Sequence, residues 1–179
     1  MRHLPYILIA FFVGLIPLIS SGQSHEPAIP NFGPTFSVPN PDFPTDTTRE
    51  YKVLFDIYQH PDDPEQINPQ LNTLARFINM HTQAGVPLEN LHVACVIHNR
   101  ASVEALNDEK YQERYGVKNP NIPLMEALEE AGASIYMCGQ SMGARGLKRE
   151  ELAAPIKVGL SAMTIILSLE QEGYQLIKF

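Results

Sequence analysis

The stretch SIYMCGQSMG, Ser134 to Gly143, decides the fold, because an apolar run stops there at a segment punctuated by glycines. The run from Ala133 to Met137 predicts a buried β-strand, and Gly139 lets the backbone turn directly after it. Cys138 stands at this transition. It is either a reactive thiol at the edge of a site or a small apolar residue that ends a strand. The rest of the chain is needed to distinguish these two interpretations.

Similar apolar runs occur before and after this strand. They predict further strands at Lys52–Gln59, Leu91–Ile97, Ile156–Gly159 and Tyr174–Phe179. The segments between them have helical spacing, as in the helix that Asn68 caps, Pro69 begins and Gly85 ends. Other helices are expected from Ala101 onwards, over Leu124–Ala131, in the charged turn KREEL and over Ser161–Glu172. We interpret Tyr111–Asn121 as a loop or a broken helix.

Strands that alternate with helices predict an α/β fold. We expect a single three-layer domain, in which a mostly parallel sheet of about five strands carries helices on both faces. Ligands of such sheets bind beyond the carboxyl ends of the strands. Cys138 lies at the carboxyl end of one predicted strand, and His98 and His60 follow two others. These three residues are therefore expected along one edge of the sheet.

Residues 1–22 have the order of a secretory signal peptide, with a short basic start, an apolar run over Leu4–Ile19 and small residues after it. Cleavage is expected just before Gln23, which implies export to the periplasm or the medium. The alternative is a retained membrane anchor. A spanning helix needs roughly 20 apolar residues, whereas this run is shorter and is interrupted by Pro5 and Pro17. We therefore favour the cleaved signal and expect no stable membrane anchor afterwards.

Residues 23–49 are rich in proline and polar residues, which predicts an extended tether without a core of its own. Phe32, Phe36 and Phe43 are the apolar residues of this tether that are suited to dock on a neighbouring surface. Residues 50–179 have the size of one domain.

Composition and motifs exclude several classes of function. The net charge is −7 and there is no basic stripe, so nucleic acid is not expected as a partner. Two cysteines in the whole chain form neither a disulfide framework nor a C-x-x-C redox pair. The chain has no Walker loop, no dinucleotide-binding glycine motif and no serine nucleophile elbow, and no cofactor is expected.

The segment Ala162–Leu169 is apolar around most of a helix. Such a helix is buried on most of its sides. In a domain of this size a partner subunit would cover part of it, which predicts a homo-oligomer. The alternative is a helix tucked deep against its own sheet.

Several segments resemble the DsrE/DsrF-like family, which is related to the subunits of an intracellular sulfur relay. The resemblance runs from about Tyr51 to Phe179. Its segments are KVLFDI, VIHNRA, NPNIPLMEALEEAGASIYMCGQSMGARGL and VGLSAMTIILSLEQEGYQLIKF. The most specific parts are CGQS after an apolar strand and the closing EGYQLIKF.

This resemblance implies a flavodoxin-like α/β domain that assembles into homotrimers or homohexamers and exchanges sulfur with donor or acceptor proteins. In sulfur-carrying members a cysteine on the loop after a strand accepts sulfur as a persulfide, and Cys138 is the matching position. Asn99 stands where many relatives have glycine. The sheet order of the family is expected to place the first strand between the second and the third. Export would separate this chain from the known relays, which are cytoplasmic.

A persulfide carrier needs a thiolate that a donor can reach. Gly139 is expected to leave the sulfur uncrowded, and the N–H groups of the loop after it to face the sulfur as an anion-binding nest. Arg145 is expected to return toward the sulfur, and His98 to assist proton transfer. The expected site therefore has Cys138 as its catalytic residue, with His98, Asn99, Gly139, Gln140, Ser141 and Arg145 in support.

Cys95 lies inside the apolar run VACVI and is expected to pack in the core. A Cys95–Cys138 disulfide is not expected. The sheet order that the resemblance implies separates the two residues by two strand spacings, about 10 Å, whereas a disulfide needs Cα atoms within about 7 Å.

A metal site is a weaker alternative. His60, His98 and Cys138 would be its ligands, with Asp56 or Asp62 nearby. None of these residues has the short spacing of a metal-binding motif, so no metal is expected.

The leading hypothesis is an exported DsrE-like protein that binds or transfers sulfur, as a persulfide, through Cys138. The alternative is a non-catalytic oligomeric module that binds a small ligand in the same pocket, with the cysteine incidental. A gain of one sulfur atom on Cys138 distinguishes the first hypothesis from the second.

Overall fold

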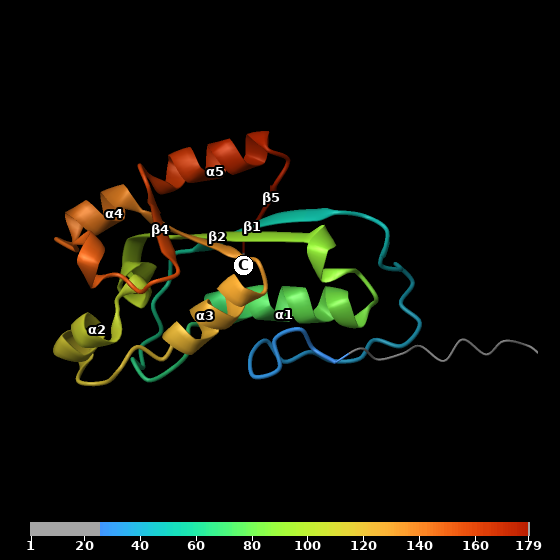
Figure 1. Ribbon diagram of the computed structural model, residues 1–179, viewed down its shortest axis with the longest axis horizontal. Helices are drawn as coiled ribbons and strands as arrows, with labels where there is room; N and C mark the ends of the chain where they lie inside the picture. The colour runs from blue at the N-terminus through green and yellow to red at the C-terminus, as the bar shows by residue number, and fades with distance from the viewer. Residues whose placement is uncertain (1–25, 179) are drawn as a thin grey trace, which may run out of the picture.

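The computed structural model describes residues 26–178 and contains five strands that alternate with helices (Figure 1). The strands are β1 (Tyr51–Ile57), β2 (Leu91–Ile97), β3 (Ser134–Cys138), β4 (Ile156–Gly159) and β5 (Gln175–Ile177). The α-helices are α1 (Pro69–Gln83), α2 (Asp108–Tyr115), α3 (Ile122–Glu130), α4 (Gly139–Ala144) and α5 (Ala162–Gln171), and the short 3-10 helices are η1 (Leu88–Asn90), η2 (Asn99–Ala105) and η3 (Arg149–Glu151). Within residues 26–178, no helix has the length and apolar character needed to cross a membrane. The predicted signal peptide, residues 1–22, lies outside the described residues.

The strands form one sheet in the order β4-β3-β2-β1-β5, and every adjacent pair is parallel. The predicted three-layer α/β architecture is confirmed, but the expected strand order is wrong. β2 and β3 are direct neighbours, and β1 lies between β2 and β5. Helices α1 and α3 both lie on the same face of the sheet. Because crossovers between parallel strands are right-handed, two crossovers on one face add their strands in the same direction, which places β2 and then β3 on the same side of β1. Helix α5 crosses the opposite face and returns the chain to the far side of β1 (Figure 1).

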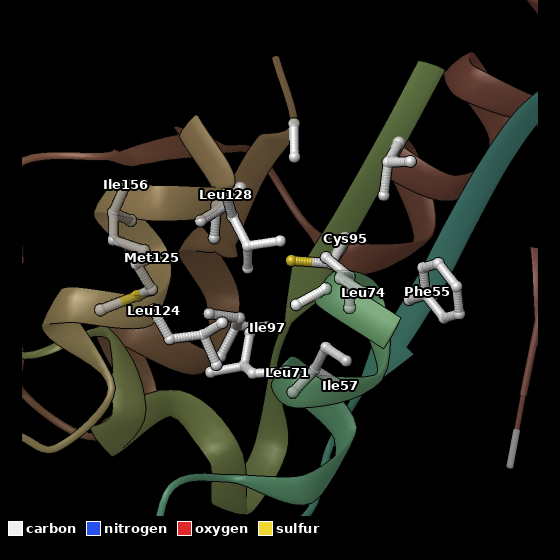
Figure 2. Close-up of a cluster of buried hydrophobic side chains, with 14 of the residues drawn as sticks. Phe55, Ile57, Leu71, Leu74, Cys95, Ile97, Leu124, Met125, Leu128 and Ile156 are labelled. Carbon is white, nitrogen blue, oxygen red and sulfur yellow. The ribbon is translucent and has the colours of Figure 1, made fainter. Parts of the chain in front are cut away.

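Alternate residues of each strand point to opposite faces and build two separate cores. On the face covered by α1 and α3, Phe55 and Ile57 of β1 belong to the larger cluster, together with the leucines of the two helices (Figure 2). On the other face, Leu54 belongs to a smaller cluster with Ile165 and Leu169 of α5. The sheet is therefore buried on both sides, as its nearly continuous apolar strands predicted.

The two cysteines lie on opposite faces of the sheet. Cys95 is fully buried in the larger cluster, and this burial raises the pKa of its thiol to about 12. Cys138 belongs to the smaller cluster under α5. Both cysteines are free. The expectation of a core role for Cys95 is confirmed, but the two sulfurs are kept apart by the sheet itself and not by an intervening strand.

Two segments differ from the interpretation as loops. Tyr111–Asn121 was interpreted as a loop or a broken helix, and its first part belongs to helix α2, which Asn107 caps by accepting a hydrogen bond from the N–H of Lys110 and which Gly116, at φ 81°, ends. Helix α4 occupies the stretch directly after β3. Its glycines suggested a loop, but the Cys138 sulfur takes the place of a capping oxygen and accepts the N–H of Ser141.

Part of the predicted tether is docked on the domain. We call residues 29–35 the N-terminal strap. Asn79 of α1 accepts a hydrogen bond from the N–H of Ile29 at 2.8 Å and donates to the carbonyl oxygens of Ile29, Phe32 and Gly33. Ile29 is buried, and Phe32 packs against the larger core. Phe36 and Phe43 are exposed, so these two aromatic residues do not dock on the domain.

Candidate functional site

The carboxyl ends of β1, β2 and β3 lie side by side at one edge of the sheet. Ile97 of β2 pairs in register with Met137 of β3. The next residue on each strand is His98 and Cys138, and these two side chains therefore point to the same face, the one covered by α5. His60 follows β1 at the same edge. The structure brings the three predicted residues to one edge, but each has its own hydrogen-bond partners.

Cys138 is the last residue of β3, and its Sγ accepts a hydrogen bond from the N–H of Ser141 at 3.4 Å. The residue is 5% exposed, so the expectation of an open sulfur is wrong: α5 begins directly over it. Desolvation by burial raises the pKa of the thiol. Hydrogen bonds from the hydroxyl and N–H of Ser141 and from the N–H groups of Ala162 and Gln140 outweigh this effect, and the pKa lies below the ordinary value of 9.0.

Ser141 connects the thiol to the end of β2. The backbone N–H of Asn99 donates to Ser141 Oγ at 3.1 Å. Because Oγ accepts this bond, its own proton is free to point at the Cys138 sulfur. Asn99 has a φ of 50°, in the left-handed region where glycine is most favourable and asparagine is tolerated. Asn99 is therefore compatible with this turn of the backbone after β2.

Gly139 and Gln140 attach the start of α4 to the segment before α5. A Cβ at Gly139 would lie 2.7 Å from the carbonyl oxygen of Gly159 and 3.1 Å from that of Leu160. Only glycine therefore allows the chain to leave β3 at this distance from the end of β4. Gln140 Nε2 donates to the carbonyl oxygen of Leu160 at 3.3 Å. Gly139 was predicted to leave the sulfur uncrowded, whereas in the structure it allows the backbone to pack closely against the carbonyl groups of Gly159 and Leu160.

His98 turns toward β1 and forms a short contact with a buried carboxylate. Its Nε2 lies 2.6 Å from Asp56 Oδ1, and the Asp56 Oδ2 atom lies 3.2 Å from Lys178 Nζ. The ring of Tyr58 is 6.3 Å from that of His98. Asp56 therefore orients the His98 ring on the strand end beside Cys138. The sequence pattern placed Asp56 only near the alternative metal site, although an acidic residue inside the apolar run VLFDI was the available signal.

Arg145 is placed away from the sulfur. It forms the C-terminal cap of α4, whereas Cys138 forms the N-terminal cap. At about 1.5 Å of rise per residue, the helix separates the two backbones by about 10 Å. The described hydrogen bonds to the sulfur come from backbone and hydroxyl groups, and Arg145 is not among their donors.

His60 has a different carboxylate partner. Its Nδ1 lies 2.6 Å from Oε1 of Glu104, whose side chain is 0% exposed. His60 also lines a groove of about 560 Å³ together with Asn99 and Arg100. Among residues 26–178, no group of three or more His, Cys, Asp or Glu side chains is arranged to hold a metal ion. His60, His98 and Cys138 do not converge on a shared centre.

Solved structures with this fold include the following two. The protein of unknown function MTH1491 from Methanobacterium thermoautotrophicum superposes with a TM-score of 0.53 at 19% identity, over 72% of this chain and 99% of that one. The ychN protein from E. coli superposes with a TM-score of 0.52 at 16% identity, again over 72% and 99% of the two chains. At these identities the likeness is one of fold.

The sequence carries a more specific relationship. The model of the DsrE/DsrF-like family matches residues 52–179. The match begins in β1 and includes every residue of the edge described above, whereas the N-terminal strap lies before it. No curated protein matches the chain significantly.

Proposed function

The chain belongs to the DsrE/DsrF-like family, and from this premise we propose that it binds or transfers sulfur as a persulfide on Cys138. The observation that carries the proposal is the hydrogen-bonded thiol at the end of β3, whose pKa is lowered by the donors around it. The thiolate is the form that attacks a sulfur donor. Groups that stabilise the anion therefore increase the reactive fraction at neutral pH.

The proposed step is a sulfur transfer without net oxidation. The Cys138 thiolate attacks the terminal sulfur of a donor persulfide, R–S–SH. A new S–S bond forms on Cys138, the S–S bond of the donor breaks, and its electron pair leaves with the donor thiolate, R–S⁻. The product is Cys138–S–SH, which keeps the terminal proton. His98, which Asp56 orients on the neighbouring strand end, is the candidate base for that proton.

The burial of Cys138 constrains the donor. The residue is almost fully covered, and the N–H of Ala162 at the start of α5 is one of the groups that cover it. We therefore expect a small persulfide to react faster than a bulky one. A protein donor would have to displace the segment between β4 and α5 before its sulfur reached the thiol.

Intact mass spectrometry tests the proposal. The protein is incubated with a small persulfide donor, and the expected result is a gain of one sulfur atom that is removed by a reductant. Cys138→Ser is expected to abolish this gain. Cys95→Ala is the matched control and is expected to keep it, because Cys95 is fully buried on the other face with a raised pKa. No gain in the wild-type protein contradicts the carrier and favours the non-catalytic binding module.

We also propose that the domain assembles with copies of itself through α5. One side of α5 packs on the sheet, whereas Met163 and Leu167 are 72% and 60% exposed and Leu160, just before the helix, is 71% exposed. Met163 and Leu167 are four residues apart and therefore lie on one side of the helix. A second copy would remove this apolar stripe from water. The native mass in solution tests the proposal, and a monomer contradicts it.

Export remains a separate proposal, supported by the order of residue types in residues 1–22. The test is the N-terminal sequence of the protein recovered from its native compartment. Cleavage just before Gln23 is the expected result. An intact N-terminus in the cytoplasm contradicts export and places the protein with the intracellular members of the family.

A further inference from the structure

A groove at the carboxyl ends of β1 and β2 has the features of a binding site and is not used by the proposed sulfur chemistry. It has a volume of about 560 Å³ and is lined by residues that directly follow the two strands, among them Tyr58, His60, Asn99 and Arg100. This volume is within the range of small-molecule sites. Its place is also the one that ligands prefer in parallel α/β sheets.

A buried carboxylate lies behind the groove. Oε1 of Glu104 lies 2.6 Å from His60 Nδ1 and accepts a hydrogen bond from Asn68 Nδ2 at 3.2 Å, and Oε2 accepts one from Asn121 Nδ2 at 2.6 Å. Burial raises the pKa of Glu104, and these hydrogen bonds oppose the rise. Burial still prevails, and the pKa of Glu104 is raised overall. Because amide N–H groups already donate to both carboxyl oxygens, the geometry favours the tautomer in which His60 Nδ1 donates to Glu104 and Nε2 is unprotonated.

This bond determines which ring nitrogen of His60 can accept a hydrogen bond from a ligand in the groove. With Nδ1 protonated and directed at Glu104, Nε2 is the ring nitrogen that can accept a hydrogen bond. The ring also packs on Tyr115, at 5.3 Å between centroids, which further restricts its orientation. Within residues 26–178 no hydrogen bond to His60 Nε2 is formed, although the side chain is only 14% exposed.

The groove also has a charge pattern. Arg100 lines it, is exposed, and forms no ion pair with any residue from 26 to 178. A guanidinium in such a position recognises a carboxylate by two parallel hydrogen bonds. Asp62 lines the same groove and is also exposed. Its negative charge disfavours ligands with several anionic groups, so the pattern fits a single negative charge.

We propose that this groove binds a small organic acid with one carboxylate and one hydroxyl or thiol group. Arg100 holds the carboxylate, and His60 Nε2 accepts the hydrogen bond from the hydroxyl or thiol. Glu104 is a positioning residue, which keeps Nε2 free for this bond. The site does not require Cys138 to react.

Lactate, propionate and propylene glycol test the proposal in NMR titrations of the His60 ring. Lactate has both groups, propionate lacks the hydroxyl, and propylene glycol lacks the carboxylate. Lactate is expected to shift the His60 resonances saturably, and the other two to bind about tenfold more weakly, because each leaves one partner of the groove unpaired. No saturable shift with lactate overturns the proposal, as does equal binding of all three compounds.

Variants identify the residues and separate the two proposals. Arg100→Gln, on the surface, is expected to weaken lactate binding at least about tenfold, whereas Arg149→Gln, which changes another exposed arginine, is expected to leave it unchanged. His60→Gln, in which binding is followed by the backbone amide resonance of Arg100 because the His60 ring is absent, is expected to remove the discrimination between lactate and propionate. Cys138→Ser is expected to bind lactate normally, so failure of the sulfur chemistry would not be confused with failure of this site. Unchanged binding in Arg100→Gln overturns the proposal.

Discussion

The backbone N–H of Asn99 donates a hydrogen bond to the hydroxyl oxygen of Ser141, whose own N–H donates to the Cys138 sulfur. One serine thus connects the ends of two neighbouring strands and directs a proton toward the thiol. Asn99 also lines the groove that contains His60. The same residue therefore supports the thiol through its backbone N–H and borders a second site.

Ser141→Ala tests this connection. The hydroxyl of Ser141 is one of the groups that lower the pKa of Cys138, and its loss leaves the opposing desolvation less compensated. The pKa of the thiol is expected to rise. The pH profile of Cys138 alkylation by iodoacetamide should move to higher pH, with a slower rate at neutral pH. Gln140→Ala is the control, since its side chain bonds the Leu160 carbonyl and not the sulfur. A profile that is the same in both variants contradicts the role of Ser141.

Gly139→Ala is expected to destabilise the fold and to disturb the thiol. The new Cβ would meet the backbone carbonyl oxygens of Gly159 and Leu160, which cannot move without separating β3 from β4. Overpacking of this kind costs about 1–3 kcal/mol, measurable by denaturant unfolding. Gly143→Ala is the matched control in the same helix. Nothing lies near its added Cβ, so its free energy of unfolding should be unchanged or slightly higher. Equal losses in the two variants would rule out the close backbone approach as the cause.

The N-terminal strap is expected to contribute to stability. Asn79→Ala removes four hydrogen bonds to the strap and should lower the free energy of unfolding by about 2 kcal/mol. Removal of all residues before Tyr51 should have an effect in the same direction. Phe36→Ser changes an exposed apolar residue just beyond the strap and should leave stability unchanged. Full stability of the truncated domain would show that the docked strap is not needed.

Charge on α5 tests the assembly. Leu167→Lys places an ammonium in the exposed apolar stripe and is expected to convert an oligomer to monomers, because an unpaired charge in an interface core is costly. Ser168→Lys adds the same charge at the next exposed position of α5 and should keep the oligomer. Sedimentation or light scattering measures both. An oligomer that survives Leu167→Lys and dissociates in Ser168→Lys would place the interface on another side of the helix.

Much of the fold could be predicted because its signals are local. Apolar runs marked the strands, Asn68 and Ser161 marked two helix starts, and both serve as caps in the structure. Strand order is not a local property. It depends on which face each crossover helix covers, and the apolar residues of a helix do not indicate that face: α5 lies on the face opposite α1 and α3.

The candidate site was predicted only in part for the same reason. The position of Cys138 at a strand end was visible in the sequence, but its burial depends on where α5 starts, and α5 starts at Ala162, 24 residues after Cys138 (162 − 138). The partners of the two histidines are also distant in the chain. Asp56 contacts His98 and Lys178, and Glu104 contacts His60. The hydrogen bonds between Asn79 and the strap could not be predicted from local sequence either, because the partners are about 50 residues apart.

The strap is fastened beneath α1, on the side of the sheet away from α5 and the thiol (Figure 1). An affinity tag or solid support joined ahead of the strap is therefore expected to hold the protein with its Cys138 side turned outward to reagents. A tag at the other terminus would adjoin Lys178, whose ammonium lies 3.2 Å from the Asp56 carboxylate. Immobilised preparations should accordingly be built from the N-terminal side.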